Sequence, residues 1–110
     1  MPVWQEAHRL SIEIFHFTEN LPRKEDYGLT SQIRRSSNSV STNISEGFGR
    51  KHTKDKINFY NYSIGSAFET QNHLLYGKGV GYFEEKIVQV LFKQYEELIL
   101  SLNKINKSLR

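Results

Sequence analysis

Six basic side chains lie within a short segment near the middle of the chain. They are Arg34, Arg35, Arg50, Lys51, Lys54 and Lys56, and only Glu46 and Asp55 oppose them. The segment therefore has a net charge of +4, six cations less two carboxylates, while the whole chain has +3 and the remainder is close to −1. Lysine and arginine concentrated in this way suit phosphate binding, because they displace the counterions condensed around a nucleic acid.

The same segment has two further features that suit a phosphate ligand. Thr53 is placed to cap a helix, and the first turn of a helix presents unpaired N–H groups to an anion. Aromatic residues flank the cations, and an exposed ring at Tyr62 can stack on an unpaired base, whereas helical spacing predicts a buried Phe59 or Tyr60. The alternative is a solvated basic loop whose cations pair with neighbouring carboxylates.

Two carboxylate–histidine pairs have spacings that other chemistry uses. Glu13 and His16 have the Glu-x-x-His spacing of di-iron bundles, but such a site needs a second motif and carboxylates from two further helices. Glu69 and His73 lie one helical turn apart, as an acid–base pair would, with no nucleophile or phosphate loop in the sequence. We therefore expect no metal, no cofactor and no enzymatic activity. A small enzyme that uses Glu46, Glu69 and His73 is kept as an alternative to a non-enzymatic protein.

The composition is that of a folded protein and is compatible with a reducing compartment. A chain of 110 residues suits one domain spanning residues 1–110, and 37% hydrophobic residues suffice for a core. Cysteine is absent, which excludes disulfides and thiolate metal sites. No apolar run approaches the roughly 18–20 residues that span a bilayer, and the first residues lack a signal-peptide pattern. We expect a cytoplasmic protein without a membrane partner.

Apolar spacing predicts two helices in the first half of the chain. The first runs from Val3 to Leu21 in alternating steps of three and four residues, and Pro22 ends it. The second runs from Leu29 to Phe48, where Gly47 and Gly49 predict a left-handed stop.

In the middle of the second predicted helix, Ser36–Ser45, residue propensity and apolar periodicity predict different structures. Eight of these ten residues are Ser, Thr or Asn, which favour caps and loops. Val40 and Ile44 nevertheless keep the helical spacing. We predict a helix that packs against Gly65–Ala67, because small side chains let two helices approach closely.

Two more helices follow. The third begins at the Thr53 cap and is predicted to bury a face made of Ile57, Tyr60, Ile64, Phe68, Gln71 and Leu75. Gly77–Gly81 contains three glycines and is predicted as the connection. The fourth helix runs from about Tyr82 to Ser108. Four amphipathic helices with short links predict an all-α, antiparallel up-and-down four-helix bundle.

The fourth helix has apolar residues beyond its regular stripe. They are Ile87, Val90, Ile99 and Leu100. A helix with more than one apolar face needs more than one neighbour, which favours oligomerisation.

Several motifs resemble one known family. They are LTSQIRR at 29–35, STNISEGFGR at 41–50 and FYNYSIGSAFE at 59–69, with VWQ at 3–5 and GY at 81–82. Together they resemble the four-helix-bundle proteins encoded in intervening sequences of bacterial 23S ribosomal RNA genes, also labelled S23 ribosomal proteins. Ser45 stands where the family usually has Ala, and Thr70 replaces a usual Leu. These departures weaken helix propensity without changing the pattern.

The resemblance implies a homopentamer of antiparallel bundles. It also implies kinship with accessory proteins of diversity-generating retroelements, which are basic pentamers that engage nucleic acid and a reverse transcriptase. We expect a non-enzymatic oligomer that binds nucleic acid, RNA in preference to DNA, through the phosphate backbone. The residues expected to bind are Arg34, Arg35, Arg50, Lys51, Lys54, Lys56 and Tyr62. The main alternative is a protein-interaction scaffold, an accessory subunit whose basic rim docks a polymerase-like partner.

Overall fold

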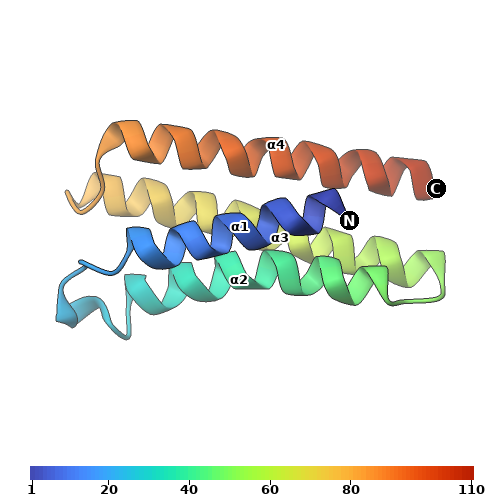
Figure 1. The fold of residues 1–110 in the computed structure, drawn as a ribbon, viewed down its shortest axis with the longest axis horizontal. Coiled ribbons are helices and arrows are strands. Elements are labelled where there is room, and N and C mark those ends of the chain that lie inside the picture. Colours follow the sequence, from blue (N-terminus) through green and yellow to red (C-terminus); the bar gives the residue numbers. More distant parts are fainter.

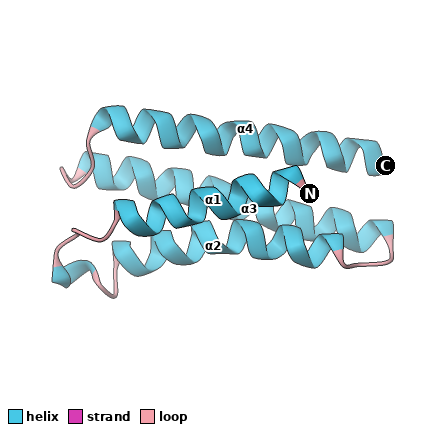
Figure 2. Cartoon of the chain, in the orientation of Figure 1, coloured by secondary structure: helices cyan, strands magenta, loops and turns pink.

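Four helices account for most of the chain. The computed structural model describes residues 1–110 and contains α1 (Pro2–Phe17), α2 (Leu29–Phe48), α3 (Thr53–Gly79) and α4 (Glu85–Leu109). A short 3-10 helix, η1 (Arg23–Glu25), joins α1 to α2, and there is no strand (Figure 2). The helices run alternately up and down along a body 43 Å long (Figure 1). The predicted all-α, antiparallel up-and-down four-helix bundle is confirmed.

All four helices contribute to one hydrophobic core. Its most enclosed side chains include Leu10 from α1, Ile33 from α2, Leu74 from α3, and Tyr95 and Leu102 from α4. Burying one such side chain contributes about 1.5–3 kcal/mol, so the apolar stripes fix which face of each helix points inward. None of the helices combines the length and apolar character that a membrane crossing requires.

The serine-rich middle of α2 is helical, as periodicity predicted. Its polar side chains bond carbonyl oxygens of the preceding turn: Ser37 Oγ donates to Arg34 O at 3.1 Å, and Asn43 Nδ2 donates to Ser39 O at 2.9 Å. Bonding of this kind satisfies the side chains without breaking the helix. Propensity is overridden here because the apolar side of α2, including Val40 and Ile44, is fully buried.

Small polar side chains also join α2 to α3. The Ser36 and Thr70 hydroxyls lie 2.8 Å apart, and Ser63 Oγ donates to Val40 O at 2.7 Å. The predicted close packing against α3 is thus present, although Gly65 itself faces open space. The other two predicted residues take part, since Ser66 Oγ donates to Ser39 Oγ at 3.0 Å and Ala67 is fully buried.

The first helix ends at Phe17, four residues earlier than predicted. Arg34 of α2 donates from Nη2 to Phe15 O at 3.1 Å and from Nε to Thr18 Oγ1 at 2.9 Å. The Phe15 carbonyl is therefore bound by a side chain, and the Glu19 N–H bonds the His16 carbonyl in a tighter turn. A tertiary contact, not Pro22, sets this boundary.

The left-handed glycine stop belongs to α3, not to α2. Gly47 lies inside α2, and Gly49 ends that helix with right-handed backbone angles. Gly81 has a φ of +89°, with Gly81 N–H bonded to Lys78 O and Tyr82 N–H bonded to Gly77 O. This pair of bonds is the Schellman motif, which satisfies carbonyls at a helix end.

Three other helix boundaries differ from the prediction. Gly77 is helical and buried, and the Phe83 ring occupies the space that a Cβ there would need. α4 begins at Glu85 because the N–H groups of Tyr82 and Phe83 both bond Gly77 O at the end of α3. At the start of α3 the N-cap is His52, one residue before the predicted Thr53. The Lys56 N–H bonds His52 O, which is the first helical hydrogen bond of α3.

The buried face of α3 is only partly the predicted one. Tyr60, Ile64 and Gln71 are buried, but Phe68 and Leu75 are exposed. The helix instead buries the small residues Ser63, Ala67 and Thr70 on the side of α2, and Gly77 against the Phe83 ring. The close approach of α2 selects the first three of these residues over larger apolar ones.

Candidate nucleic-acid interface

The turn between α2 and α3 holds its cations in a fixed arrangement. Gly47 lets the Tyr60 ring pack directly on α2, since a Cβ there would lie 2.7 Å from the ring. Residues 49–52 therefore form a tight connection at the end of the bundle where the two chain ends also lie (Figure 1).

Lys56 serves the fold at this turn. Its ammonium donates to Phe48 O at 2.9 Å and to Gly47 O at 3.3 Å, the last carbonyls of α2. It also lies 5.8 Å from the centre of the Phe48 ring. A cation at a helix C-terminus satisfies unpaired carbonyls and the helix dipole, so Lys56 is already engaged.

Arg50 is partly engaged. Its guanidinium lies 3.2 Å from a Glu46 carboxylate oxygen and stacks 4.6 Å from the centre of the Phe59 ring. The Glu46–Arg50 pair considered for a solvated loop is therefore present. Lys51 and Lys54, by contrast, are exposed and form no ion pair.

The two remaining predicted cations lie elsewhere. Arg34 stacks on Phe15 at 4.1 Å, in addition to its bonds to the end of α1. Arg35 is exposed on the outer side of α2. Arg35 lies thirteen residues before the end of α2 at Phe48, about 20 Å along the helix at 1.5 Å per residue, and Arg50 lies beyond that end. The single predicted cluster is therefore divided, and Arg34 is a structural residue.

The aromatic residues beside the turn differ in exposure as predicted. Tyr60 is buried and Phe59 is half-buried beneath Arg50, whereas Tyr62 is 57% exposed. Phe48 is 65% exposed and offers a second accessible ring. Both rings are available for stacking on an unpaired base.

The fold brings a second group of cations to the same end of the bundle. Asn106 of α4 donates from Nδ2 to Asn61 Oδ1 of α3 at 2.9 Å, which places the last turns of α4 beside the first turns of α3. Those last turns carry Lys104, Lys107 and Arg110, with no Asp or Glu after Glu97. The sequence prediction missed them because they are far from the turn in the chain. The antiparallel order of the helices would have revealed them.

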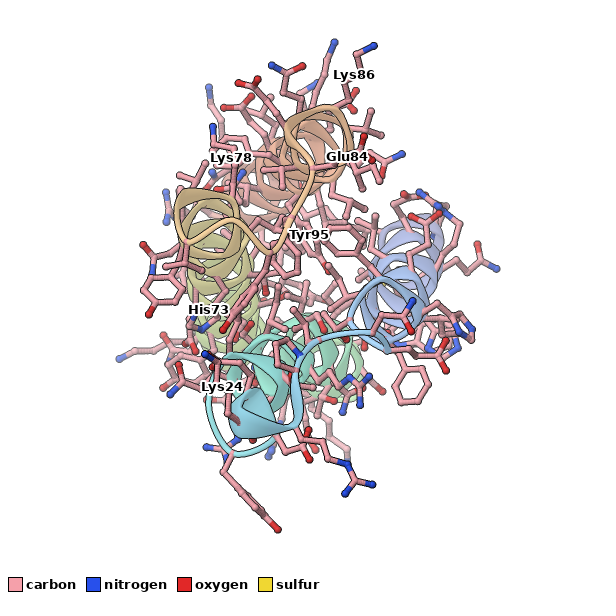
Figure 3. The ribbon with its side chains drawn as sticks, turned by 90° about the vertical axis from the view of Figure 1, so that its left-hand side faces the viewer. Lys24, His73, Lys78, Glu84, Lys86 and Tyr95 are labelled. Carbon is pink, nitrogen blue, oxygen red and sulfur yellow. The ribbon has the colours of Figure 1, made fainter.

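The two ends of the bundle differ in charge. Seven cations and two carboxylates gather at the end with the α2–α3 turn, in residues 46–56 and 98–110. Figure 3 views the opposite end, where Lys78 and Lys86 lie on the same side as Glu84 and Lys24 lies on the other side of the bundle. Residues 23–26, 78 and 84–86 there hold four cations and four carboxylates. The net positive charge of the chain is therefore concentrated at one end.

The carboxylate–histidine pairs occupy simple surface contacts. Glu13 pairs with Arg9 at 3.2 Å, and His16 Nδ1 lies 2.9 Å from Glu19. His73 lies 3.4 Å from Glu69. No three His, Cys, Asp or Glu side chains are grouped so that they could hold a metal ion.

The largest hollows lie along the seam between α1 and α4 and are open to solvent. Their volumes are about 700 Å³ near Met1 and Lys104 and about 510 Å³ near Phe17 and Val90.

Tyr95 points into the interior between the helices (Figure 3), where burial raises the pKa of its phenol. The Tyr95 hydroxyl has no hydrogen-bond partner.

The fold and this end surface define an all-α, up-and-down bundle with segregated charge. A family model described as "23S rRNA-intervening sequence protein" matches residues 1–104, and the chain belongs to that family. A solved structure of a protein of unknown function from the S23 ribosomal protein family of Bacteroides thetaiotaomicron has the same fold, with a TM-score of 0.86. It is 23% identical in sequence, and the match covers 96% of this chain and 98% of that one. No curated protein matches the sequence.

Proposed function

We propose that this chain is a non-enzymatic protein that binds RNA through phosphate groups at the end of the bundle formed by the α2–α3 turn. The supporting observation is the segregation of charge, because residues 46–56 and 98–110 at that end hold seven cations and two carboxylates. Lys51 and Lys54 are exposed and unpaired, so a phosphate can reach them without breaking an ion pair. Arg50 can contribute as well, in competition with Glu46. The family name, which refers to 23S rRNA, supports RNA over DNA as the ligand.

The dimensions of the bundle favour backbone contacts over base reading. Across its long axis the chain measures 24 by 18 Å, whereas the DNA major groove is about 12 Å wide. No helix projects from the bundle to enter a groove (Figure 1). Contacts to phosphates position a ligand without reading its sequence, so affinity is expected to vary little between unrelated RNAs. The exposed Phe48 and Tyr62 rings favour single-stranded regions.

We also propose self-association, with a homopentamer as the expected form. Ile87, Val90 and Leu100 of α4 are exposed, whereas Ile99 is buried within the chain. Three of the four surplus apolar residues are thus available to a neighbouring subunit. A ring would repeat the cationic end once per subunit, and weak phosphate contacts would add together. Sedimentation at micromolar concentration tests this proposal, and a stable monomer of 12.9 kDa would contradict it.

The binding proposal is tested by two matched double variants. Lys51→Ala with Lys54→Ala removes the two unpaired cations of the turn, while Lys86→Ala with Lys93→Ala makes the same charge change elsewhere on exposed positions of α4. Fluorescence anisotropy with three unrelated single-stranded RNAs should show weaker binding by the turn variant for all three. The control variant, Lys86→Ala with Lys93→Ala, should bind as the wild type does. Equal affinities for the two variants would contradict a site at the turn.

The exposed apolar side chains also support a second function, that of a scaffold for a protein partner. Phe68 and Leu75 of α3 lie on its surface together with the α4 residues named above. If the protein binds no RNA at low salt, this alternative replaces the first. The basic end would then dock an acidic surface of the partner.

A further inference from the structure

The last turns of α4 and the first turns of α3 are held in register. The hydrogen bond between Asn106 and Asn61 fixes which residues face one another, and in antiparallel helices Arg110 then lies level with residue 57. Lys54 lies about one turn from residue 57, towards the N-terminus of α3. Neighbouring helix axes lie about 8–10 Å apart, so the backbones at Lys54 and Arg110 are on the order of 10 Å from each other.

This distance allows the charges to act together. The Debye length at physiological ionic strength is about 8 Å, so cations on the two helices share one electrostatic field. Lys107 and Arg110 are exposed, and neither forms an ion pair. Lys78, at the other end, lies 3.9 Å from Glu85. Lys107 and Arg110 thus lie unpaired at the end of the bundle that also carries Lys51 and Lys54.

Polar groups lie between the two sets of cations. Asn58 and Asn61 are exposed on the first turns of α3. Asn61 accepts the bond from Asn106 through Oδ1, which leaves its Nδ2 group free to donate. Amide donors of this kind bond phosphate and sugar oxygens in nucleic-acid interfaces.

We infer that the last turns of α4 form the second half of the RNA-binding surface, with Lys107 and Arg110 contacting phosphates of the same single strand that Lys51 and Lys54 contact. This inference rests on the proposed function. The match to the family model ends at residue 104, so both cations lie beyond the matched region. The strand crosses the seam between α3 and α4 over Asn61.

The test compares two double variants in the full chain. Lys107→Ala with Arg110→Ala removes the α4 cations, and Lys51→Ala with Lys54→Ala removes those of the turn. Each should bind a single-stranded RNA on the order of tenfold more weakly than the wild type at 50 mM salt. Each should also reduce the steepness of the log–log salt dependence by about 1.4, since a single-strand phosphate contact contributes about 0.7. Lys107→Arg with Arg110→Lys keeps both charges and should bind as the wild type does.

The possible results separate the two proposals. If the α4 variant binds with wild-type affinity and salt dependence while the turn variant is weakened, the inference about α4 is wrong and the proposed function stands. If the wild type shows no salt-dependent binding, the proposed function itself is wrong. If the charge-keeping variant loses binding as well, the effect arises from the shape of α4, and the inference is overturned. Far-UV circular dichroism of each variant checks that α4 remains helical.

Discussion

The Lys56 ammonium donates a 2.9 Å hydrogen bond to the Phe48 carbonyl at the end of α2. One cation of the basic turn is therefore used to close a helix, two residues after Lys54, which is unpaired. Arg50 and Lys56, which make contacts within the turn, flank Lys51 and Lys54, which are free for a ligand. Single substitutions can separate the two roles.

Lys56→Ala should lower the free energy of unfolding by about 1–2 kcal/mol. The change removes charge-assisted hydrogen bonds to two terminal carbonyls and a favourable interaction with the helix dipole. Lys54→Ala is the matched control and should change stability by less than about 0.5 kcal/mol, as expected for an exposed unpaired residue. Urea denaturation of both variants measures the difference. Equal stabilities would show that the bonds from Lys56 do not stabilise the turn.

Arg34→Ala should destabilise the fold by about 2 kcal/mol. Arg34 donates to Phe15 O and Thr18 Oγ1 and stacks on the Phe15 ring, and both kinds of contact are lost in the variant. Arg35→Ala, its exposed neighbour, should be close to neutral in stability. Thermal unfolding of the two variants provides the measurement. A neutral Arg34→Ala variant would restore Arg34 to the group of possible ligand-binding cations.

These two arginines illustrate what the sequence could and could not predict. The apolar stripes predicted four helices and their order, because burial depends on a spacing that is visible in the chain. The roles of adjacent Arg34 and Arg35 could not be separated, since the difference depends on the end of α1, sixteen or more residues away. The cations of α4 were missed for a similar reason, because only the folded register places Asn106 beside Asn61.

Helix boundaries show the same limit at the glycines. Glycine content alone predicted a loop at Gly77–Gly81. Gly77 is instead helical and buried, with the Phe83 ring packed against it. Among these glycines only Gly81 has the left-handed conformation that glycine readily adopts. A pattern of glycines identifies a helix end without identifying which glycine makes it.

Gly77→Ala should destabilise the fold by about 1–2 kcal/mol. A methyl group would overlap the Phe83 ring, and the strain exceeds the gain in helix propensity. Gly79→Ala is the control, because a Cβ at that position meets open space. The control should be neutral or more stable by about 0.4–1 kcal/mol. Denaturant midpoints that fall equally for both variants would contradict the packing of Phe83 on Gly77.

Glu25 should make stability depend on acid pH. The N–H of Leu29 and then the hydroxyl of Tyr82 bond its carboxylate, and together they lower the pKa of Glu25 below its ordinary value of 4.5. The unfolded chain therefore binds a proton more readily than the folded chain. The stabilisation is present above pH 4.5 and is lost as the pH falls through the lowered pKa.

The Glu25→Gln variant tests this expectation by thermal unfolding between pH 3 and 6. The variant should lose less stability than the wild type as the pH falls, because it no longer has this titrating group. Tyr82→Phe removes only one of the two donors and should behave in an intermediate way. Parallel pH profiles for the wild type and Glu25→Gln would contradict the contact between η1 and the start of α2.

The most direct test of RNA binding at the cationic end is the salt dependence of the wild-type affinity. Binding to a labelled single-stranded RNA is measured by anisotropy from low to physiological ionic strength. With four of the unpaired cations, Lys51, Lys54, Lys107 and Arg110, each contacting a phosphate, the log–log slope should be about −2.8 for one subunit and steeper for an oligomer. A slope near zero, or no binding at the lowest salt, would contradict phosphate recognition by this end of the bundle.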